Sequence, residues 1–309
     1  MKSTYALTDI QVHNREVYLK YFIESLRNAK DIESVLLIFS HDYIDEKINK
    51  LIANITFCKY MQIFYPYSTQ LHPNVFPGPD EKDKETGRNA TTMQMKHHWW
   101  WKVNKVFHFL STTDYDGLVL LLEEDFYMVK DFIPTLKLMQ ETARKSCDSC
   151  ELFSLALNEH SVNVDMAQEN KANHIRKSNR ISNMGISLTA SSWKKIVSQK
   201  KCFCEYDDYN WDFTLQYLFS KCLNDADTMQ LMYPRVIHIG ACGAHFTSDN
   251  CDPVPIINKM HNKLKKVDEL LFPGKLEEDR SVRSFYNSAR NGGWNDRRDQ
   301  ELCLNMTNY

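Results

Sequence analysis

Three consecutive acids follow an apolar run near the middle of the chain and are its first candidates for chemistry. Gly117 to Leu122 leads directly into Glu123, Glu124 and Asp125. A continuous Leu and Val run is typical of a strand buried on both faces in an α/β protein, and ligands gather at the carboxyl ends of such strands. Crowded carboxylates repel one another unless a cation neutralises them. The run therefore predicts a site for Mg²⁺ or Mn²⁺ and substrate phosphates, against the alternative of a plain polar strand end.

A second acid triplet, Glu277-Glu278-Asp279, has a different context. It follows no apolar run and lies among Lys275, Arg280 and Arg283. Mixed charges of this kind are typical of a solvated face. We therefore expect the second triplet to be a surface segment.

A helix that carries an acid is predicted after Tyr206. Asp208 is placed to cap it, and its apolar stripe consists of Trp211, Leu215 and Leu218. Asp212 would lie one turn after Asp208, beside that stripe. Apolar surroundings raise the pKa of a carboxylate, as a general base requires. The alternative, that these acids only charge the amino end of the helix, explains Asp207 and Asp208 better than Asp212.

Histidines supply two further candidates. A short strand from Arg235 to Ile239 leads into a loop, His238 to His245, that contains two glycines. Imidazole is a competent ligand for ions such as Mn²⁺, and glycine lets the backbone approach a ligand closely. For His97 and His98, hydrogen bonding within a packed helix start and contact with a substrate remain equal alternatives.

Alternating strands and helices position the polar groups of the first third of the chain. The expected strands are Ile10 to Val12, Ser34 to Phe39 and Tyr60 to Phe64, and the first two end in His13-Asn14-Arg15 and Ser40-His41-Asp42. This order predicts an α/β fold with a parallel, right-handed sheet covered on both faces. Polar residues at successive strand ends are what a nucleotide site needs. The chain contains no G-x-G-x-x-G or P-loop motif, which disfavours a Rossmann dehydrogenase or a P-loop enzyme.

The next segments are a proline-rich loop and an aromatic helix. Pro66 to Thr92 predicts a long surface loop, either a flexible lid or an insertion, with a charged patch from Asp80 to Arg88. A helix from Gln94 to Leu110 follows. Its three consecutive tryptophans cannot share one face, so we expect at least one in the core and another beside a pocket. Asn158 to Ser182 has no clear period and predicts a variable loop.

Composition places the chain among globular proteins. Its 309 residues are 43% hydrophobic and 25% charged, with a net charge of −2. The absence of a basic stripe makes nucleic acid an unlikely partner. No apolar run reaches the roughly 18 to 20 residues of a membrane span, and no signal peptide is evident. Taken literally, these features indicate a cytosolic chain.

The cysteines indicate the secretory pathway instead. Eight of the nine cysteines lie between Cys147 and Cys303, and Cys58 stands apart. This distribution predicts four disulfides and one free thiol, with a zinc site or a redox pair as the alternative. Three N-x-Thr acceptors, at Asn54, Asn89 and Asn305, agree with secretion. The targeting segment would then be missing from this sequence.

Long motifs resemble the N-acetylglucosaminyltransferase II family over nearly the whole chain. They include the acid triplet, the block from Tyr206 to Asp212 and the His-x-Gly-x-Cys-Gly loop. Others are Gln11-Val12-His13-Asn14-Arg15, Lys96-His97-His98-Trp99-Trp100-Trp101-Lys102, Gly292-Gly293-Trp294 and Glu301-Leu302-Cys303. The resemblance implies one GT-A catalytic domain over 1–309, with a mixed, mostly parallel sheet covered by helices on both faces. Its nucleotide-binding half would span about 1–130 and its acceptor and base half about 131–309.

The resemblance also implies an activity. Members of the family transfer GlcNAc from UDP-GlcNAc to the 2-hydroxyl of the α-1,6-arm mannose of an N-glycan, with inversion and with Mn²⁺. They act on glycoproteins in the Golgi lumen as type II membrane proteins, whose anchor and stem we expect to be absent from this chain. The alternatives from the residues are a metal-free glycoside hydrolase that uses Asp125 and Asp212, and a catalytically inactive glycan-binding protein.

Site residues carry over from the family by motif. Asp212 would be the catalytic base, and Asp125 and His238 would ligate manganese. The donor would be bound by Gln11, Val12, His13, Asn14, Arg15, Asp42, Gln94, Met95, Lys96, His97 and His98. The implied disulfides are Cys147–Cys150, Cys202–Cys303, Cys204–Cys222 and Cys242–Cys251, with Cys58 free.

Three departures from the family pattern stand out. The loop after Pro77 is shorter and lacks an additional cysteine pair. Cys202 lies only two residues before Cys204. The family's donor-binding arginine has no counterpart near Ser161 and Val162, where Arg176 and Arg180 are candidate substitutes.

Overall fold

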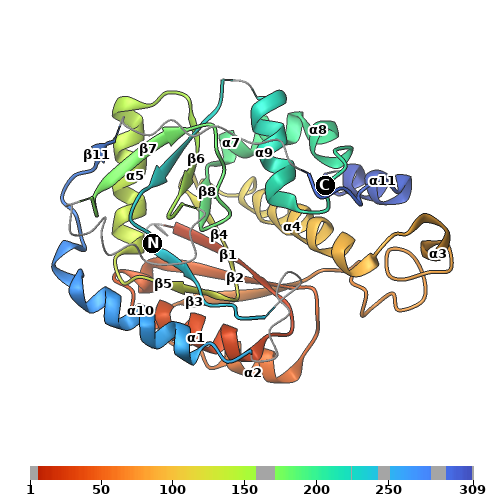
Figure 1. The fold of residues 1–309 in the computed structure, drawn as a ribbon, viewed down its shortest axis with the longest axis horizontal. Coiled ribbons are helices and arrows are strands. Elements are labelled where there is room, and N and C mark those ends of the chain that lie inside the picture. The colour runs from red at the N-terminus through yellow and green to blue at the C-terminus, as the bar shows by residue number, and fades with distance from the viewer. Residues whose placement is uncertain (1–5, 158–170, 224, 243–250, 280–289, 308–309) are drawn as a thin grey trace.

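A mixed sheet of nine strands runs through the centre of the molecule, with helices on both sides (Figure 1). The computed structural model describes residues 6–157, 171–223, 225–242, 251–279 and 290–307. The strand order is β11-β7-β9-β6-β8-β4-β1-β2-β3, and β10 pairs with β5 in a separate ribbon. The strands are β1 (Ala6–Val12), β2 (Val35–His41), β3 (Lys59–Phe64), β4 (Val119–Glu123), β5 (Phe126–Met128), β6 (Cys150–Ser154), β7 (His174–Ser178), β8 (Ile186–Leu188), β9 (Asp227–Leu231), β10 (Val236–His238) and β11 (Glu277–Glu278).

Strand directions confirm the expected mixed, mostly parallel sheet. β3, β2, β1 and β4 are parallel neighbours, as are β6 with β9 and β7 with β11. β8 is antiparallel to both β4 and β6, and β7 is antiparallel to β9. The parallel half is the one that the sequence predicts from its alternating strands and helices. The antiparallel strands are short and fall in the half where the sequence has a weaker period.

Helices cover the sheet on both faces, as expected (Figure 1). The longest, α4, begins at Ala90, four residues earlier than expected, because the Asn89 side chain accepts hydrogen bonds from the amides of Thr91 and Thr92. The helices are α1 (Glu16–Arg27), α2 (Glu46–Ala53), α3 (Asp83–Thr86), α4 (Ala90–Leu110), α5 (Phe132–Ser146), α7 (Ala190–Ser198), α8 (Lys200–Cys204), α9 (Trp211–Lys221), α10 (Val254–Lys266) and α11 (Arg297–Asn305). Across the ranges given above, none of these helices is both long and apolar enough to cross a membrane.

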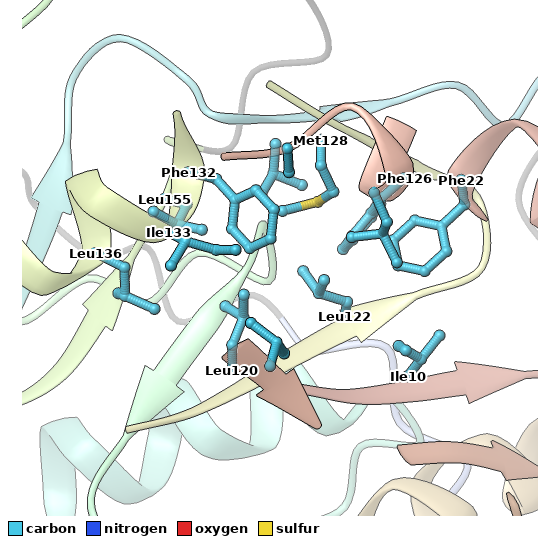
Figure 2. Close-up of a cluster of buried hydrophobic side chains, with 14 of the residues drawn as sticks. Ile10, Phe22, Leu120, Leu122, Phe126, Met128, Phe132, Ile133, Leu136 and Leu155 are labelled. Carbon is cyan, nitrogen blue, oxygen red and sulfur yellow. The ribbon is translucent and has the colours of Figure 1, made fainter. Parts of the chain in front are cut away.

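The strand that delivers the acid triplet is buried on both faces. Leu120 and Leu122 of β4 belong to one core with α1 and α5 (Figure 2), whereas Val119 and Leu121 belong to a second core with α4 and α9. Side chains alternate across a strand, so an apolar run without polar interruptions is what two cores require. The prediction of a doubly covered β4 is confirmed.

All three consecutive tryptophans lie in the second core. Trp99, Trp100 and Trp101 are each at most 7% exposed. Trp100 donates a hydrogen bond to the carbonyl of Cys303, 3.1 Å away. None of the three is therefore needed to wall an open pocket, because α4 is surrounded by protein along most of its length.

The proline-rich loop is tied to the carboxyl-terminal helix α11. Arg88, expected on the surface, is buried and binds both carboxylate oxygens of Asp299 at 2.6 and 2.8 Å. Arg298 pairs with Asp80 and Asp83 from the same loop. These ion pairs favour an anchored insertion over a flexible lid. The loop also contains the short helix α3, which its composition does not suggest.

Two strands lie in segments whose sequence has no strong hydrophobic periodicity. β7 lies inside the expected variable loop, of which residues 158–170 are outside the described residues. In the second acid triplet Glu277 and Glu278 are exposed, as expected, and form the edge strand β11, whereas Asp279 is half-buried.

Four disulfides form, and two of the four expected pairings are wrong. Cys147–Cys150 and Cys242–Cys251 agree with the expectation, and Cys58 is free. Cys202 pairs with Cys222 and Cys204 with Cys303, instead of the reverse.

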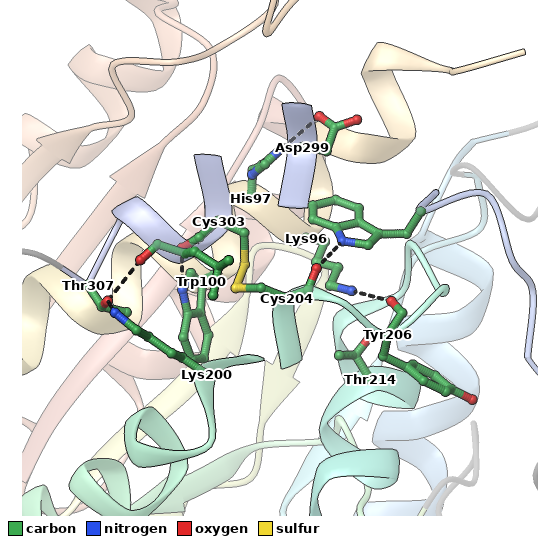
Figure 3. The surroundings of a disulfide bond; sticks show 12 residues. Lys96, His97, Trp100, Lys200, Cys204, Tyr206, Thr214, Asp299, Cys303 and Thr307 are labelled. Atoms are coloured by element: carbon green, nitrogen blue, oxygen red, sulfur yellow. Dashed lines mark hydrogen bonds and ion pairs between the residues drawn. A yellow bond between two sulfur atoms is a disulfide. The ribbon is translucent and has the colours of Figure 1, made fainter. Parts of the chain in front are cut away.

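The exchange of partners follows from helix geometry. Cys202 and Cys204 are two residues apart on α8, so their side chains leave the helix in nearly opposite directions. Cys204 is fully buried and faces Cys303 on α11, which is also fully buried (Figure 3). Cys202 is left for Cys222, at the end of α9.

This connectivity predicts unequal contributions to stability. Replacing Cys204 and Cys303 by serine should lower the free energy of unfolding by about 1 kcal/mol more than replacing Cys202 and Cys222, because loop-closure entropy grows with loop length. The two bridges span 99 and 20 residues. Urea unfolding of the two double variants measures the difference. Peptide mapping without reduction tests the pairing itself, and a peptide linking Cys202 to Cys303 would contradict it.

Candidate functional site

The polar ends of three parallel strands meet at one edge of the sheet. In the register of β1 with its neighbours, Gln11 lies opposite Ser40 on one side and opposite Glu123 on the other. The amide of Glu124 donates to the carbonyl of Gln11, and the amide of Asp42 donates to the carbonyl of Val12. The structure thus brings together the three polar segments that the sequence predicts for a nucleotide site.

Asp42 is the centre of a hydrogen-bonded group. Its carboxylate lies 2.6 Å from His13 Nδ1, 2.9 Å from Gln94 Nε2 and 3.5 Å from His98 Nδ1. Burial alone would raise the pKa of Asp42, but its hydrogen bonds to His13 and His98 hold it well below the ordinary range. Burial lowers the pKa of His13, and the bond to Asp42 more than offsets this, so the pKa of His13 is raised. The Asp42 side chain is therefore ionised and is held in place by these neighbours.

Arg15 neutralises two of the three acids. Its Nε lies 2.6 Å from Glu124 Oε1 and its Nη1 lies 2.6 Å from Asp125 Oδ2. Glu124 also accepts from the amide of His13 at 2.9 Å. Burial raises the pKa of Glu124 despite these contacts. Glu124 thus shapes the turn from His13 to Arg15 instead of facing a ligand, a role that the sequence leaves open.

Glu123 stands apart from this ion pair. It is half-buried at the end of β4. Burial and the neighbouring Asp125 carboxylate raise its pKa to about 7. Gln11, opposite it on β1, has a buried amide oxygen with no hydrogen-bond partner among the described residues.

The ribbon of β5 and β10 brings His238 to the acid triplet. His238 pairs with Phe126, the residue after the triplet, and the amide of Ile239 donates to the carbonyl of Asp125. His238 Nε2 consequently lies 3.2 Å from Asp125 Oδ2. Burial lowers the pKa of His238, but the hydrogen bond from its imidazole to the Asp125 carboxylate more than offsets this, so the pKa is raised. Two residues far apart in sequence, both predicted as metal ligands, are neighbours in the fold.

Asp125 and His238 suit a divalent cation. Asp125 Oδ1 is buried and accepts no hydrogen bond from the described residues. A Cβ at Gly240 would lie 2.7 Å from Asp125 Oδ2 and 3.0 Å from His238 Nε2, so only glycine leaves these atoms uncovered. Carboxylate oxygen and imidazole nitrogen are a donor set that Mn²⁺ accepts. Within the part of the chain described here, no group of three acidic, histidine or cysteine ligands converges.

Tyr18 holds the loop that contains Gly240. Its hydroxyl accepts from the amides of Ala241 and Cys242 at 3.0 and 3.1 Å and donates to the carbonyl of Cys251 at 3.0 Å. From the sequence, Tyr18 is only part of the apolar face of α1. A buried tyrosine retains a polar end that needs partners, and this is the signal that could have marked it.

The positions of Asp208 and Asp212 relative to α9 differ from the expectation. Asp208 does not cap the helix, because α9 begins at Trp211 with Asn210 before it. Asp208 instead accepts hydrogen bonds from the amides of Asn210 and Asn291, at 2.9 and 2.8 Å. Asp212 is half-buried in the first turn of α9, not one turn after a cap. A carboxylate at this position is favoured in its charged form by the helix amino end.

Helix α4 distributes the candidate donor residues over several directions. Gln94 and His98, one turn apart, face Asp42, and His98 Nε2 also lies 2.8 Å from Ser40 Oγ. His97 lies 2.9 Å from Asp299 on α11. Lys96 donates to the carbonyls of Tyr206 and Asp208. Met95 is half-buried. For both histidines, bonding within a packed helix describes the observed contacts.

Comparison with known proteins identifies the family. The sequence model of N-acetylglucosaminyltransferase II (MGAT2) matches residues 2–87 and 85–303. The chain belongs to the N-acetylglucosaminyltransferase II family. The alpha-1,6-mannosyl-glycoprotein 2-beta-N-acetylglucosaminyltransferase of Sus scrofa is 36% identical over 327 residues, and that of Homo sapiens is 37% identical over 328. Each alignment covers 95% of this chain and 71% of the relative.

Solved structures are more distant than these members of the N-acetylglucosaminyltransferase II family. The galactosyltransferase LgtC, in complex with donor and acceptor sugar analogues, is similar with a TM-score of 0.42 and 12% identity. The match covers 85% of this chain and 94% of that chain.

One departure from the family pattern is the missing donor-binding arginine. Ser161 and Val162, where the family's donor-binding arginine is missing, lie outside the described residues. Arg176, one candidate substitute, is buried on β7 and binds Gln230 Oε1 at 2.9 Å.

Asp299 and Arg88 are central to the packing of α4, yet no local pattern in the sequence marks them.

The group around Asp42 predicts a change in histidine titration. In the Asp42→Asn variant the pKa of His13 should fall, because burial, which lowers it, remains while the hydrogen bond and the charge of Asp42, which raise it, are lost; the weaker effect of Glu124 stays. Just above pH 6.5 a smaller fraction of the imidazole is then charged in the variant than in the parent protein. NMR titration of the ring protons measures this.

The parent protein and a distant variant provide the controls. In the parent protein the pKa of His41 should be lowered to about 4, because of burial and the nearby His98. Asp227→Asn, which alters a carboxylate bonded to Ser149, should leave His13 unchanged. An unchanged His13 titration in Asp42→Asn would refute the assigned contact.

Proposed function

We propose that this chain transfers GlcNAc from UDP-GlcNAc to the 2-hydroxyl of the α-1,6-arm mannose of an N-glycan. The observation that carries the proposal is the identity of 36–37% over 95% of the chain to relatives named for this activity. The structure supports it, since the polar ends of β1, β2 and β4 meet at one edge of the sheet and His238 lies beside Asp125 there. We further propose a single GT-A catalytic domain, with the donor half at about 1–130 and the acceptor half at about 131–309.

The donor site is proposed at the strand ends. The segment from Gln11 to Arg15 and the carboxylate of Asp42 would bind uridine and ribose. Their support is the close packing of the polar ends of β1, β2 and β4. Gln94 and His98 would act by holding Asp42, to which both are bonded. Preorganised polar groups of this kind bind a ligand without reorganisation.

The metal site is proposed at Asp125 and His238, with Mn²⁺ as the ion. The buried Oδ1 of Asp125 and the space above Gly240 support it. With two ligands from the protein, the remaining positions would be filled by the donor diphosphate and water. When bound, the ion would neutralise charge that grows on the diphosphate. Arg15 would keep the Asp125 carboxylate oriented through Oδ2.

Asp212 is proposed as the base. Its carboxylate would accept the proton of the mannose 2-hydroxyl while that oxygen attacks the anomeric carbon of GlcNAc. The bond from the anomeric carbon to the phosphate oxygen breaks on the opposite side, and UDP leaves with the electron pair. One displacement inverts the anomeric centre. The charged form favoured at the amino end of α9 is the form that accepts a proton.

We propose the Golgi lumen as the place of action, with N-glycans on glycoproteins as acceptors. The four disulfides support an oxidising compartment, because cytosolic thiols are kept reduced.

Removing the base should separate transfer from binding. Asp212→Asn should lower the rate of GlcNAc transfer by at least ~100-fold, because a general base contributes about 10²–10⁴-fold. UDP-GlcNAc affinity should change little, since the proposed base acts on the hydroxyl of the acceptor. Incubation with UDP-GlcNAc, Mn²⁺ and defined N-glycans, followed by mass and linkage analysis, tests both the activity and the variant. Glu205→Gln, at an exposed acid of the same segment, is the matched control. Near-normal turnover in Asp212→Asn would show that the base lies elsewhere.

Removing a metal ligand should weaken manganese binding itself. We expect Asp125→Asn to raise the dissociation constant for Mn²⁺ in the presence of UDP by at least ~100-fold, because even residues behind the ligands contribute 10- to 100-fold. Calorimetry or the electron paramagnetic resonance signal of free Mn²⁺ measures it. Asp116→Asn, at an exposed acid before the same strand, controls for the loss of one charge. Unchanged affinity would exclude Asp125 as a ligand.

A further inference from the structure

One helix contacts both the donor group and the segment that carries the base. Gln94 and His98 on α4 reach Asp42. Lys96 (Figure 3) and Trp99 lie three positions apart on the same helix, and they reach the turn before α9 and its first residue. Residues at this spacing share a helix face. The distance between donor and base is therefore set along a single rigid element.

Lys96 makes an unusual contact for a buried lysine. Its side chain is fully buried, and Nζ donates to the carbonyls of Tyr206 and Asp208 at 3.1 and 2.9 Å. The ammonium also lies 4.2 Å from the centre of the Trp294 ring. Its direct acceptors are main-chain oxygens, not carboxylates. Burial lowers the pKa of the Lys96 amino group well below its ordinary value, against the opposing effect of the Asp208, Asp207 and Asp299 carboxylates, so these hydrogen bonds are made at the expense of desolvation.

The turn that Lys96 holds has further attachments. The carbonyl of Asp208 also accepts from Thr214 Oγ1 at 3.2 Å, and that hydroxyl lies 2.9 Å from the carbonyl of Asn210. The Asp208 carboxylate binds the amides of Asn210 and Asn291. The polypeptide between Tyr206 and Asn210 is thus fixed through its own carbonyls and amides.

The same turn leads directly into the proposed base. α9 begins at Trp211, and the side chain of Asn210, the residue before it, makes no capping hydrogen bond to the helix. Trp211 stacks on Trp99 with ring centres 4.6 Å apart and an interplanar angle of 5°. The start of α9, and with it Asp212, is therefore held by α4 through one ammonium and one aromatic ring.

We propose that Lys96 is a positioning residue for the transfer reaction. Its ammonium fixes the turn from Tyr206 to Asn210, and this turn places the Asp212 carboxylate relative to the donor groups that α4 holds through Gln94 and His98. The inference rests on the proposed function. It gives Lys96 the role of positioning the base Asp212, whereas the family motif implies that Lys96 binds the donor.

The central test separates positioning from stability. Lys96→Met removes the ammonium and leaves the aliphatic stem. We expect kcat for transfer to fall on the order of 100-fold, the effect of an approximately 1 Å displacement of a reacting group. The dissociation constant for UDP-GlcNAc with Mn²⁺ should stay close to the parent value. A residue that only stabilises the fold would not change kcat in protein that remains folded.

Two variants from the same cluster are matched controls. Lys200→Met makes the same substitution at a lysine that binds Thr307 and does not contact the turn (Figure 3). Trp100→Phe removes a buried hydrogen bond from α4 to Cys303. Both should keep kcat near the parent value when assayed well below their melting temperatures, even where the melting temperature falls.

A milder variant keeps the test decisive if Lys96→Met does not fold. Thr214→Val removes the second donor to the carbonyl of Asp208 and should lower kcat about 10-fold, with donor affinity unchanged. A parent-like kcat in folded Lys96→Met, or in Thr214→Val if the first variant is insoluble, overturns the proposal. So does an equal loss in Trp100→Phe at matched stability. If the parent protein itself transfers no sugar, the proposed function is wrong. This outcome is distinct from a parent-like kcat in the variants, which overturns only the role of Lys96.

Discussion

The parallel register of β2, β1 and β4 is the constraint on which the candidate site depends. It places Ser40, Gln11 and Glu123 opposite one another, so the residues that follow each strand leave the sheet at the same edge. A shift by one residue would exchange the two faces of every strand. The two cores prevent such a shift, because β4 contributes alternate residues to each of them. The burial of apolar side chains thus fixes the position of the charged ones.

Charge at this edge is balanced by protein cations before any ligand binds. Arg15 bridges Glu124 and Asp125, and the histidines around Asp42 hold its carboxylate ionised. Without these partners, acids so deeply buried would take up protons. The arrangement leaves Asp125 Oδ1 without a hydrogen bond from the described residues. An unpartnered carboxylate oxygen of this kind favours a cationic ligand.

Sequence reasoning predicts what local patterns encode. The strand ends at Arg15, Asp42 and Asp125 follow from apolar runs that stop at polar residues, and all three meet in the fold. His238 follows less directly, as a histidine at the start of a glycine-containing loop, because the ribbon of β5 and β10 that delivers it is formed by strands of three residues. The pairing of Cys202 and Cys204 depends on which way each side chain leaves α8. Spacing in the sequence does not contain that information.

Three polar residues of the loop before α4 and of α4 itself are buried for a common reason. Lys96, His97 and Arg88 are polar and would ordinarily be exposed, yet all three are buried by α8, α9 and α11, which come from the last third of the chain. Their partners are carbonyls or a single carboxylate, Asp299, that no nearby motif predicts. A polar residue in the middle of an aromatic helix can therefore indicate a long-range attachment as readily as a ligand contact. In this chain those attachments join the donor edge of the sheet to the helix that carries Asp212.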